Sequence, residues 1–442
     1  MSSLEELKKK SSEILESNKS LAIDLSKSIL SEPETGYKEF KTNKKIYDVL
    51  NSLGLKVRNN LAVTGLMTTI TGQQPGPHIA VIGELDGLPV PGHPFEDKNT
   101  HAAHACGHHI QIGNMLSTLL ALNSPEILKD ISGSISFIAV PSEEYVEIEW
   151  RKEQRDKGSF EFLGGKQELV KLGIFDDIDI SMMTHARGSF SGFGYGGTGN
   201  GLVAKFIEFR GKSSHAGGDP HLGINALNAA NIALSSIHAN RETFFDDNHI
   251  RVHPIITHGG SVVNQVPEIV TLETFVRGAS IEAIKVANLK VDNCLRAGAM
   301  AVGAEVEINT LPGYFPLFHD SNLQEIYKQN LSNSKFESKE LSHGGGSTDM
   351  GDLAHLMPVI HPYVGGATDA SAHTAGFLVE DYDLAVIQAG KMMAYTIIDL
   401  LFEGASKGNE VISQHKPKLT KSEYLRVMRE FSNVEVANYN IG

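Results

Sequence analysis

Three short apolar runs in the first half of the chain constrain its fold more than any other feature. They are residues 78–83, 135–140 and 178–183, and each is almost entirely apolar over the length of a strand. Runs of this kind are typical of strands that are buried on both faces of a sheet. Helical patterns separate them, as in residues 110–122. Strands that alternate with helices predict an α/β domain whose sheet is mainly parallel and flanked by helices.

A second domain is predicted in the middle of the chain, after the glycine-rich residues 193–201. A phosphate-binding loop is disfavoured there, because a strand-like run follows the glycines in place of a helix. The pattern continues in the order strand 202–210, helix 222–239, strand 250–258, strand 268–277, helix 280–301 and strand 304–311. This βαββαβ order predicts a compact inserted domain. We therefore divide the chain into residues 1–200, the inserted domain 201–312, and residues 313–442, which contain a helix at 382–402 and a polar tail.

Composition restricts the class of protein further. Hydrophobic residues make up 41% and charged residues 21% of the 442, values close to those of globular proteins. A net charge of −14 disfavours nucleic acid as a partner, which leaves a small molecule as the expected one. No apolar run approaches the length of a membrane span, and residues 1–18 resemble an amphipathic helix more than a signal peptide. The two cysteines cannot form a disulfide framework, which favours a cytoplasmic location.

Each of the three apolar runs ends in polar residues. The first leads into Glu84 and Asp86, the second into Glu143 and Glu144, and the third into His185. Ligands of open α/β sheets bind beyond the carboxyl ends of the strands. If the three strands are parallel, these side chains should therefore meet in one crevice.

A dense histidine segment precedes the predicted helix 110–122. Residues 101–109, HAAHACGHH, hold four histidines and Cys106. A cysteine near a helix N-terminus has a lowered thiol pKa, and a metal binds the thiolate. Cysteine and histidine together suit zinc or another borderline divalent ion. A single histidine is more often structural, but this density favours a metal site.

Two further patterns allow more than one interpretation. The pair Glu143-Glu144 can be a solvated charge pair, or one glutamate can bind a metal while the other acts as general base. The string Ser213-Ser214-His215 could suggest nucleophilic catalysis. Adjacency in sequence is not the geometry of a catalytic triad, so a serine mechanism is disfavoured.

With these residues assembled, the chain resembles the M20 peptidase family, in particular its amidohydrolase/aminoacylase branch. The matching stretches occur in the family's order and span residues 30–400; they are GELDGLP (83–89), HACGHH (104–109), PSEE (141–144), MTH (183–185), SSHAGGDP (213–220), GGSVVNQVPE (259–268), GSTDMGD (346–352) and SAHTAGF (371–377). The stretch GSTDMGD is most similar to members such as p-aminobenzoyl-glutamate hydrolase and M20-domain dipeptidases.

The resemblance implies one or two divalent ions, most often zinc or manganese, held by Cys106, His108, Glu144, His185 and His373. It further implies that Glu143 is the general base and acid and that Asp86 supports a metal ligand. The inserted domain would be a lid and dimerisation domain of a homodimer. Its His215 would stabilise the oxyanion, reaching a neighbouring subunit's site. The substrate would be held by Asn264, Arg277, Gly345, Gly346 and Ser347.

The expected activity is metal-dependent hydrolysis of an amide bond in an N-acyl amino acid or acylated amino-acid conjugate. A dipeptidase or carboxypeptidase on the same scaffold is the first alternative, and a non-catalytic dimeric binding protein is the second. The chain also departs from the family pattern. His109 stands where many relatives have Asp or Asn, and Glu84 stands where peptidase branches have a ligand histidine. The segment 145–164 is longer than usual and could shape the pocket or be a surface excursion.

Overall fold

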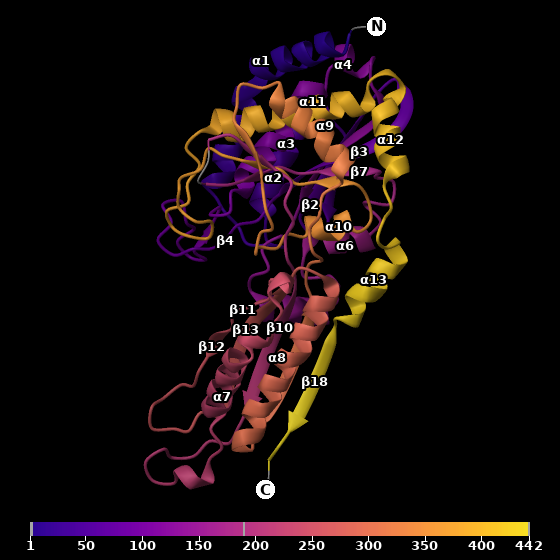
Figure 1. Ribbon diagram of the computed structural model, residues 1–442. Helices are drawn as coiled ribbons and strands as arrows, with labels where there is room; N and C mark the ends of the chain where they lie inside the picture. The colour runs from indigo at the N-terminus through magenta and orange to yellow at the C-terminus, as the bar shows by residue number, and fades with distance from the viewer. Residues whose placement is uncertain (1–2, 189–190, 441–442) are drawn as a thin grey trace.

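The chain forms two bodies, an α/β domain and an elongated inserted domain that extends from it (Figure 1). The computed structural model describes residues 3–188 and 191–440. The N-terminus lies at the far end of the α/β domain, and the C-terminus lies at the opposite tip, beside the inserted domain (Figure 1).

The α/β domain is built on a six-stranded sheet in the order β1-β2-β6-β3-β7-β16. Its strands are β1 (Val57–Leu61), β2 (Gly65–Thr71), β6 (Ser132–Val140), β3 (Gln74–Glu84), β7 (Ile180–Met182) and β16 (Val359–Ile360). The pairs β6–β3, β3–β7 and β7–β16 are parallel, and the pairs involving β1 or β2 are antiparallel. The three predicted strands are thus parallel neighbours at the centre of the sheet. This is the arrangement under which the polar residues at their ends were expected to meet in one crevice.

The middle of strand β3 is apolar because both of its faces are buried. Along β3, Ala80 and Ile82 pack into one hydrophobic core, while Ile79 and Val81 pack into the core on the other face of the sheet. Successive side chains of a strand point to opposite faces, so a strand between two cores must be apolar at every position.

Helices cover both faces of this sheet. One face carries α1 (Leu4–Leu30), α3 (His108–Leu122) and the helix formed by η4 (Asp383–Gln388) and α11 (Ala389–Leu401), which pack on one another. Residues 383–401 are long and apolar enough to cross a membrane, yet 89% of their apolar window is buried inside the protein, so they serve here as a core helix. The other helices of this domain are α2 (Phe40–Ser52), α4 (Pro125–Leu128), α5 (Ile148–Asp156), α6 (Gly165–Lys171), α9 (Ser321–Ser332), α10 (Met350–Ala354), η5 (Glu403–Ala405), α12 (Ser406–Gln414) and α13 (Lys421–Glu430).

Two small sheets hold the loops at the carboxyl edge of the main sheet. The first has the order β15-β9-β17-β8, from Ser338–Glu340, Phe193–Tyr195, Tyr363–Val364 and His185–Ala186, and the second pairs β4 (Leu88–Pro89) with β5 (Ala102–Ala103). These pairings fix segments that are far apart in sequence around one crevice.

The inserted domain has the predicted βαββαβ order, with a sheet whose pairs are all antiparallel. Its elements are β10 (Gly201–Arg210), η1 (Pro220–Leu222), α7 (Ala226–Ala239), η2 (Arg241–Thr243), η3 (Asp246–Asn248), β11 (Arg251–Val252), β12 (Ile255–His258), β13 (Ile269–Gly278), α8 (Ile281–Val302) and β14 (Glu305–Pro312). Helix α8 begins after Ser280, whose side chain accepts the N–H of Ala283, and ends at Gly303, whose φ of 71° suits glycine. The predicted fold class is therefore confirmed.

Two predicted elements of the inserted domain differ in their bounds. Helix α7 begins at Ala226 and not at residue 222, because Asn225 caps it and Pro220–Leu222 form a separate turn. The predicted strand 250–258 is split into β11 and β12, with Pro254 between them. Proline has no N–H to donate to a neighbouring strand, which explains the break.

The residues predicted as a polar tail form further helices and a strand, the last of which ends at Asn438. After α13, whose Thr420 and Glu423 form a capping box, strand β18 (Asn433–Asn438) pairs antiparallel with β14. The end of the chain thus joins the sheet of the inserted domain and covers its β14 edge (Figure 1). The inserted domain therefore takes its last strand from outside the predicted boundaries 201–312.

Candidate active site

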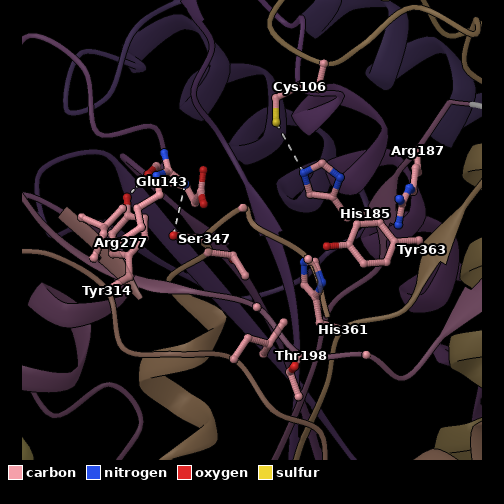
Figure 2. A pocket seen from close by; sticks show the side chains of 18 of the residues that line it. Cys106, Glu143, His185, Arg187, Thr198, Arg277, Tyr314, Ser347, His361 and Tyr363 are labelled. Atoms are coloured by element: carbon pink, nitrogen blue, oxygen red, sulfur yellow. Dashed lines mark hydrogen bonds between the residues drawn. The ribbon is translucent and has the colours of Figure 1, made fainter. Parts of the chain in front are cut away.

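The crevice predicted at the strand ends is present. Glu84 is the last residue of β3, and Asp86 lies just beyond it. Glu143 and Glu144 follow the end of β6, and His185 follows β7. Cys106 approaches from the turn before α3, and its thiol faces the ring of His185 (Figure 2).

The donor atoms of four predicted ligands lie close together. The Sγ of Cys106 is 3.5 Å from Nε2 of His185 and 3.3 Å from Nε2 of His373, and that nitrogen is 3.1 Å from Oε1 of Glu144. The fifth predicted ligand, His108, forms a group with Cys106 and His185 whose donor atoms all lie within 4.8 Å of one another. The structure therefore brings the whole predicted ligand set together.

This arrangement fits a divalent cation. Zinc binds nitrogen and sulfur donors at roughly 2.0–2.3 Å, so tetrahedral donors lie roughly 3.3–3.7 Å apart. In addition, Oε1 of Glu144 and Nε2 of His108 are buried and make no contact of hydrogen-bond geometry within the described residues, although each has a charged neighbour at 3.1 Å. Buried polar atoms normally have a partner, and a bound ion would supply one here.

The surroundings of Cys106 favour the thiolate. Burial and the Glu144 carboxylate act to raise the pKa of the thiol, but the imidazoles of His185 and His108 outweigh them and lower the pKa to about 6. The thiolate is the form of cysteine that binds metals, so the site is prepared for a cation by its own histidines.

Asp86 holds three parts of the site in place. Its Oδ1 accepts the backbone N–H of Glu143 at 3.1 Å, and its Oδ2 accepts that of Glu144 at 2.8 Å. The ring of His108 is also oriented here, because its Nδ1 lies 2.9 Å from the backbone oxygen of Asp86 and 3.3 Å from Oδ1. With Nδ1 engaged, Nε2 of His108 is directed at the metal ligands.

Glu143 lies beside the ligand set without a strong partner for its carboxylate. Its Oε2 is 3.8 Å from Nε2 of His108, and the hydroxyl of Tyr314 donates to its backbone oxygen. Burial, followed by the negative charges of Glu84 and Glu144, raises the pKa of Glu143 well above its ordinary value. A carboxylate in this environment has a strong affinity for a proton, as a general base requires.

A buried lysine, which sequence reasoning did not identify, lies beneath these glutamates. The Nζ of Lys166 is 2.5 Å from Oε1 of Glu84 and forms a second, short ion pair with Asp349, and all three side chains are buried. The other oxygen of Glu84 lies 3.1 Å from Nε2 of His108. The sequence contained one signal for this ion-pair network, since Asp349 belongs to the GSTDMGD stretch. Lys166 itself lies in a helix that carries no recognisable motif.

The cavity in front of these residues has a volume of about 520 Å³, a size typical of small-molecule sites. Arg277, Gly346 and Ser347 line it, as predicted, and Nη1 of Arg277 donates to Oγ of Ser347 at 3.1 Å. Gly345 lies in an adjoining hollow that Arg277 also lines. Figure 2 shows Arg277, Glu143, Tyr314 and Ser347 gathered on one side of the cavity.

Two predicted site residues are not in this cavity. His215 and Asn264 lie in neighbouring loops of the inserted domain, where the N–H of Ala216 donates to the backbone oxygen of Asn264. His215 accepts the N–H of Gly218 at its own Nδ1 and makes no contact with the metal ligands. The resemblance placed His215 in a neighbouring subunit's site. The position of His215 within a single chain does not test that prediction.

Backbone strain is concentrated at two positions of the site. Ser142, directly before the glutamate pair, has a φ of 57°, and the metal-ligand candidate His373 has a φ of 65°. Residues other than glycine pay for such left-handed conformations, which are typical of sites where a side chain must be aimed. The turn at Ser142 directs the chain so that both following N–H groups reach Asp86.

Two departures from the family pattern have structural explanations. His109 faces away from the cavity, and its Nε2 lies 3.2 Å from the hydroxyl of Tyr382. In the segment 145–164, Tyr145 and Val146 line the cavity, whereas Phe160, Phe162 and Leu163 pack in the core. The segment is therefore neither a surface excursion nor mainly a pocket wall.

Comparisons with known proteins give a family match and several similar hydrolases. Residues 200–300 match the family model described as the peptidase dimerisation domain of the M20 type. The Xaa-Arg dipeptidase of Mus musculus is 28% identical over 74% of this chain and 71% of its own length. The N-acyl-L-amino acid amidohydrolase of Geobacillus stearothermophilus is 30% identical over 44% of this chain and 50% of its own.

A solved structure shares the fold. A Bacillus subtilis protein described as a dinuclear metal-binding peptidase of the M20 family superimposes with a TM-score of 0.65 at 19% identity, covering 87% of this chain and 99% of its own. The resemblance predicted from the sequence is thereby confirmed. The names of these relatives describe hydrolysis of amide bonds, the reaction class expected for the chain.

Proposed function

We propose that this chain, which is similar to M20 metal-dependent hydrolases, cleaves the amide bond of an N-acyl amino acid or acylated amino-acid conjugate. The observation that carries the proposal is the donor set of Cys106, Glu144, His185 and His373 with Glu143 free beside it, in one cavity with Arg277. A site that only bound metal would have no need of the extra carboxylate, whereas hydrolysis needs a base.

The bound metal would polarise the scissile carbonyl and lower the pKa of a water molecule, which supplies the nucleophile at neutral pH. Cys106, His108, Glu144, His185 and His373 would hold it. The thiolate and imidazole donors favour zinc, and manganese is the second choice. Glu84, His108 and Glu143 also have donor atoms within 4.8 Å of one another. Because His108 belongs to the first donor set and Glu143 acts as the base, we assign no second ion to this group.

The chain's own residues perform the proton transfers and hold the substrate. Glu143 takes a proton from the attacking water and returns it to the leaving nitrogen, so that the amide C–N bond breaks as a carboxylate and an amine form. The Arg277 guanidinium, already positioned by Ser347, binds the carboxylate of the amino acid by two parallel hydrogen bonds. Asp86 holds the backbone of both glutamates in place by accepting their N–H groups.

We propose further that the chain works as a homodimer in which His215 completes the partner's site. Support comes from the match of residues 200–300 to a dimerisation domain. The sheet of the inserted domain ends in β18 on one side and in β11 and β12 on the other, and β12 exposes Ile255 and Ile256. An open strand edge with exposed apolar side chains is a natural surface for a second copy.

The test is an activity screen of the zinc- and manganese-loaded protein with N-acetyl amino acids and free dipeptides. We expect hydrolysis of the N-acetyl compounds, loss of activity on chelation, and recovery when metal is restored. A preference for free dipeptides would favour dipeptidase activity, the second candidate, which the 28% identity to an Xaa-Arg dipeptidase supports. No hydrolysis of either class by the metal-loaded protein would contradict the proposal and favour a binding protein.

A further inference from the structure

Two short strands present four side chains to the wall of the cavity opposite Arg277. Strand β8 pairs parallel with β17, so that His185 lies beside Tyr363. The pairing extends past the strand ends, because the N–H of His185 donates to Pro362 and that of Arg187 donates to Val364. Residues two apart in an extended chain face the same side, which places Arg187 with His185 and His361 with Tyr363. All four line the cavity.

The guanidinium group of Arg187 has no anionic partner among the described residues. Within residues 3–188 and 191–440, no hydrogen bond or ion pair engages its side chain, which lies over the ring of Tyr363 at 5.6 Å from the ring centre. An arginine stacked on an aromatic ring keeps its five N–H groups available while its orientation is fixed. The side chain is exposed and borders the cavity, so these donors can reach a ligand.

His361 provides a second, independent indication of a ligand. Its side chain is 1% exposed, and neither ring nitrogen has a hydrogen-bond partner among the described residues. Its ring lies 5.1 Å from that of Tyr363 and 5.7 Å from that of His185. A buried imidazole without a partner is costly, and an acceptor group inside the cavity would satisfy its N–H.

The two arginines of the cavity lie on opposite sides of the metal-ligand residues. Figure 2 shows Arg277 with Glu143 and Ser347 on one side and Arg187 with Tyr363 on the other, with Cys106 and His185 between them and His361 below His185. A substrate whose amide is at the metal site therefore extends toward one arginine from each end.

We propose that Arg187, His361 and Tyr363 form a second anion subsite, which binds a carboxylate on the acyl side of the substrate. This assignment rests on the proposed function, in which Arg277 binds the carboxylate of the amino acid. One guanidinium with neutral hydrogen-bonding neighbours suits a single negative charge, and a carboxylate matches its planar pair of donors. The preferred substrates are then N-acyl amino acids whose acyl group ends in a carboxylate.

The test compares three acyl groups of similar length on one amino acid, chosen as the best N-acetyl substrate. They are the succinyl group, the uncharged succinamoyl group and the butanoyl group, measured by kcat/KM with the zinc-loaded protein. We expect the succinyl compound to exceed the succinamoyl compound by about tenfold or more, since a charged hydrogen-bonded pair contributes at least that much. In Arg187→Gln the ratio should fall toward one, whereas Arg58→Gln, an exposed arginine of β1 outside the cavity, should keep it.

The outcomes separate the inference from the proposed function. A wild-type ratio near one, or an Arg187→Gln protein that keeps the wild-type ratio, would overturn the subsite while leaving amide hydrolysis intact. If none of the three compounds is hydrolysed, the proposed function fails, and the subsite is judged by calorimetry with the same zinc-loaded proteins. Tighter binding of the succinyl than the succinamoyl compound, lost in Arg187→Gln, would support it, and equal binding would refute it.

Discussion

The carboxylate of Asp86 accepts the backbone N–H of Glu144 at 2.8 Å, so a buried side chain at one strand end fixes the position of a candidate metal ligand at the next. It also orients His108. We expect Asp86→Ala to weaken metal binding by about 10–100-fold, the usual effect of removing a group that orients ligands. Competition with a chelating dye would measure this.

A matched control is Asp97→Ala. Asp97 also accepts two backbone N–H groups, from Asn99 and Thr100, in an exposed loop that does not contact the ligands. Its removal should leave metal affinity unchanged. Equal weakening in both variants would show that Asp86 contributes only general stability.

The buried Lys166 should be essential for stability. In Lys166→Met, the carboxylates of Glu84 and Asp349 are left without the cation that lies between them. Breaking a buried pair of this kind costs about 3–5 kcal/mol, because an uncompensated charge stays buried. Denaturant unfolding of the chelator-treated proteins would measure the change in the free energy of unfolding.

Lys421→Met provides the comparison for Lys166→Met. Lys421 forms an exposed ion pair with Asp176, and such pairs contribute about 0–1 kcal/mol. The triple variant Lys166→Met/Glu84→Gln/Asp349→Asn should recover part of the loss. If Lys166→Met alone unfolds like the wild type, the network carries no net stability.

Dimerisation should depend on the β12 edge of the inserted sheet. A charge in place of the exposed Ile255 on β12 would be buried against the same edge of a second copy, so Ile255→Lys should shift the protein to monomers and reduce kcat by removing His215 from the partner's site. Analytical sedimentation would measure the oligomeric state of each variant. Val434→Lys on β18, an equally exposed valine at the opposite edge of the sheet, should stay dimeric. A wild-type protein that is monomeric at all concentrations would contradict the role proposed for His215.

Arg277 should discriminate substrates by their carboxylate. Lysine cannot reproduce the two parallel hydrogen bonds of a guanidinium, so Arg277→Lys should raise KM by about tenfold for N-acyl amino acids. The corresponding amino-acid amides, which lack the charge, should be affected much less. If the KM of both substrate classes rises equally, Arg277 supports the cavity wall through Ser347 and does not bind the carboxylate.

Much of this architecture could be predicted because the informative residues follow buried strands. The apolar runs before Glu84, Glu143 and His185 are central parallel strands, and parallel strands bring their carboxyl ends together. The donor set around Cys106 was predicted through motifs, and the structure places its members side by side.

The rest depended on tertiary contacts that leave no local pattern. Lys166 lies in an ordinary helical segment, and only its ion pairs with Glu84 and Asp349 reveal its place. Strand β18 consists of alternating polar and apolar residues after a polar stretch, and it is a strand because the edge of β14 is available to pair with it. The position of Arg187 on the cavity wall follows from the pairing of β8 with β17, which joins segments almost 180 positions apart and has no local sequence pattern.

The most direct test of the central claim compares Glu143→Gln with Glu144→Gln, because hydrolysis by this site requires that one glutamate act on protons and the other bind metal. Metal content and single-turnover rate would be measured for both variants on the same N-acyl amino acid. We expect Glu143→Gln to keep its metal and lose about 10²–10⁴-fold in rate, and Glu144→Gln to lose metal affinity. A Glu143→Gln protein that loses metal and regains its rate at high metal concentration would show that the two roles are reversed. Full metal content and full rate in both variants would contradict the account, because the crevice at the strand ends would then not be the active site.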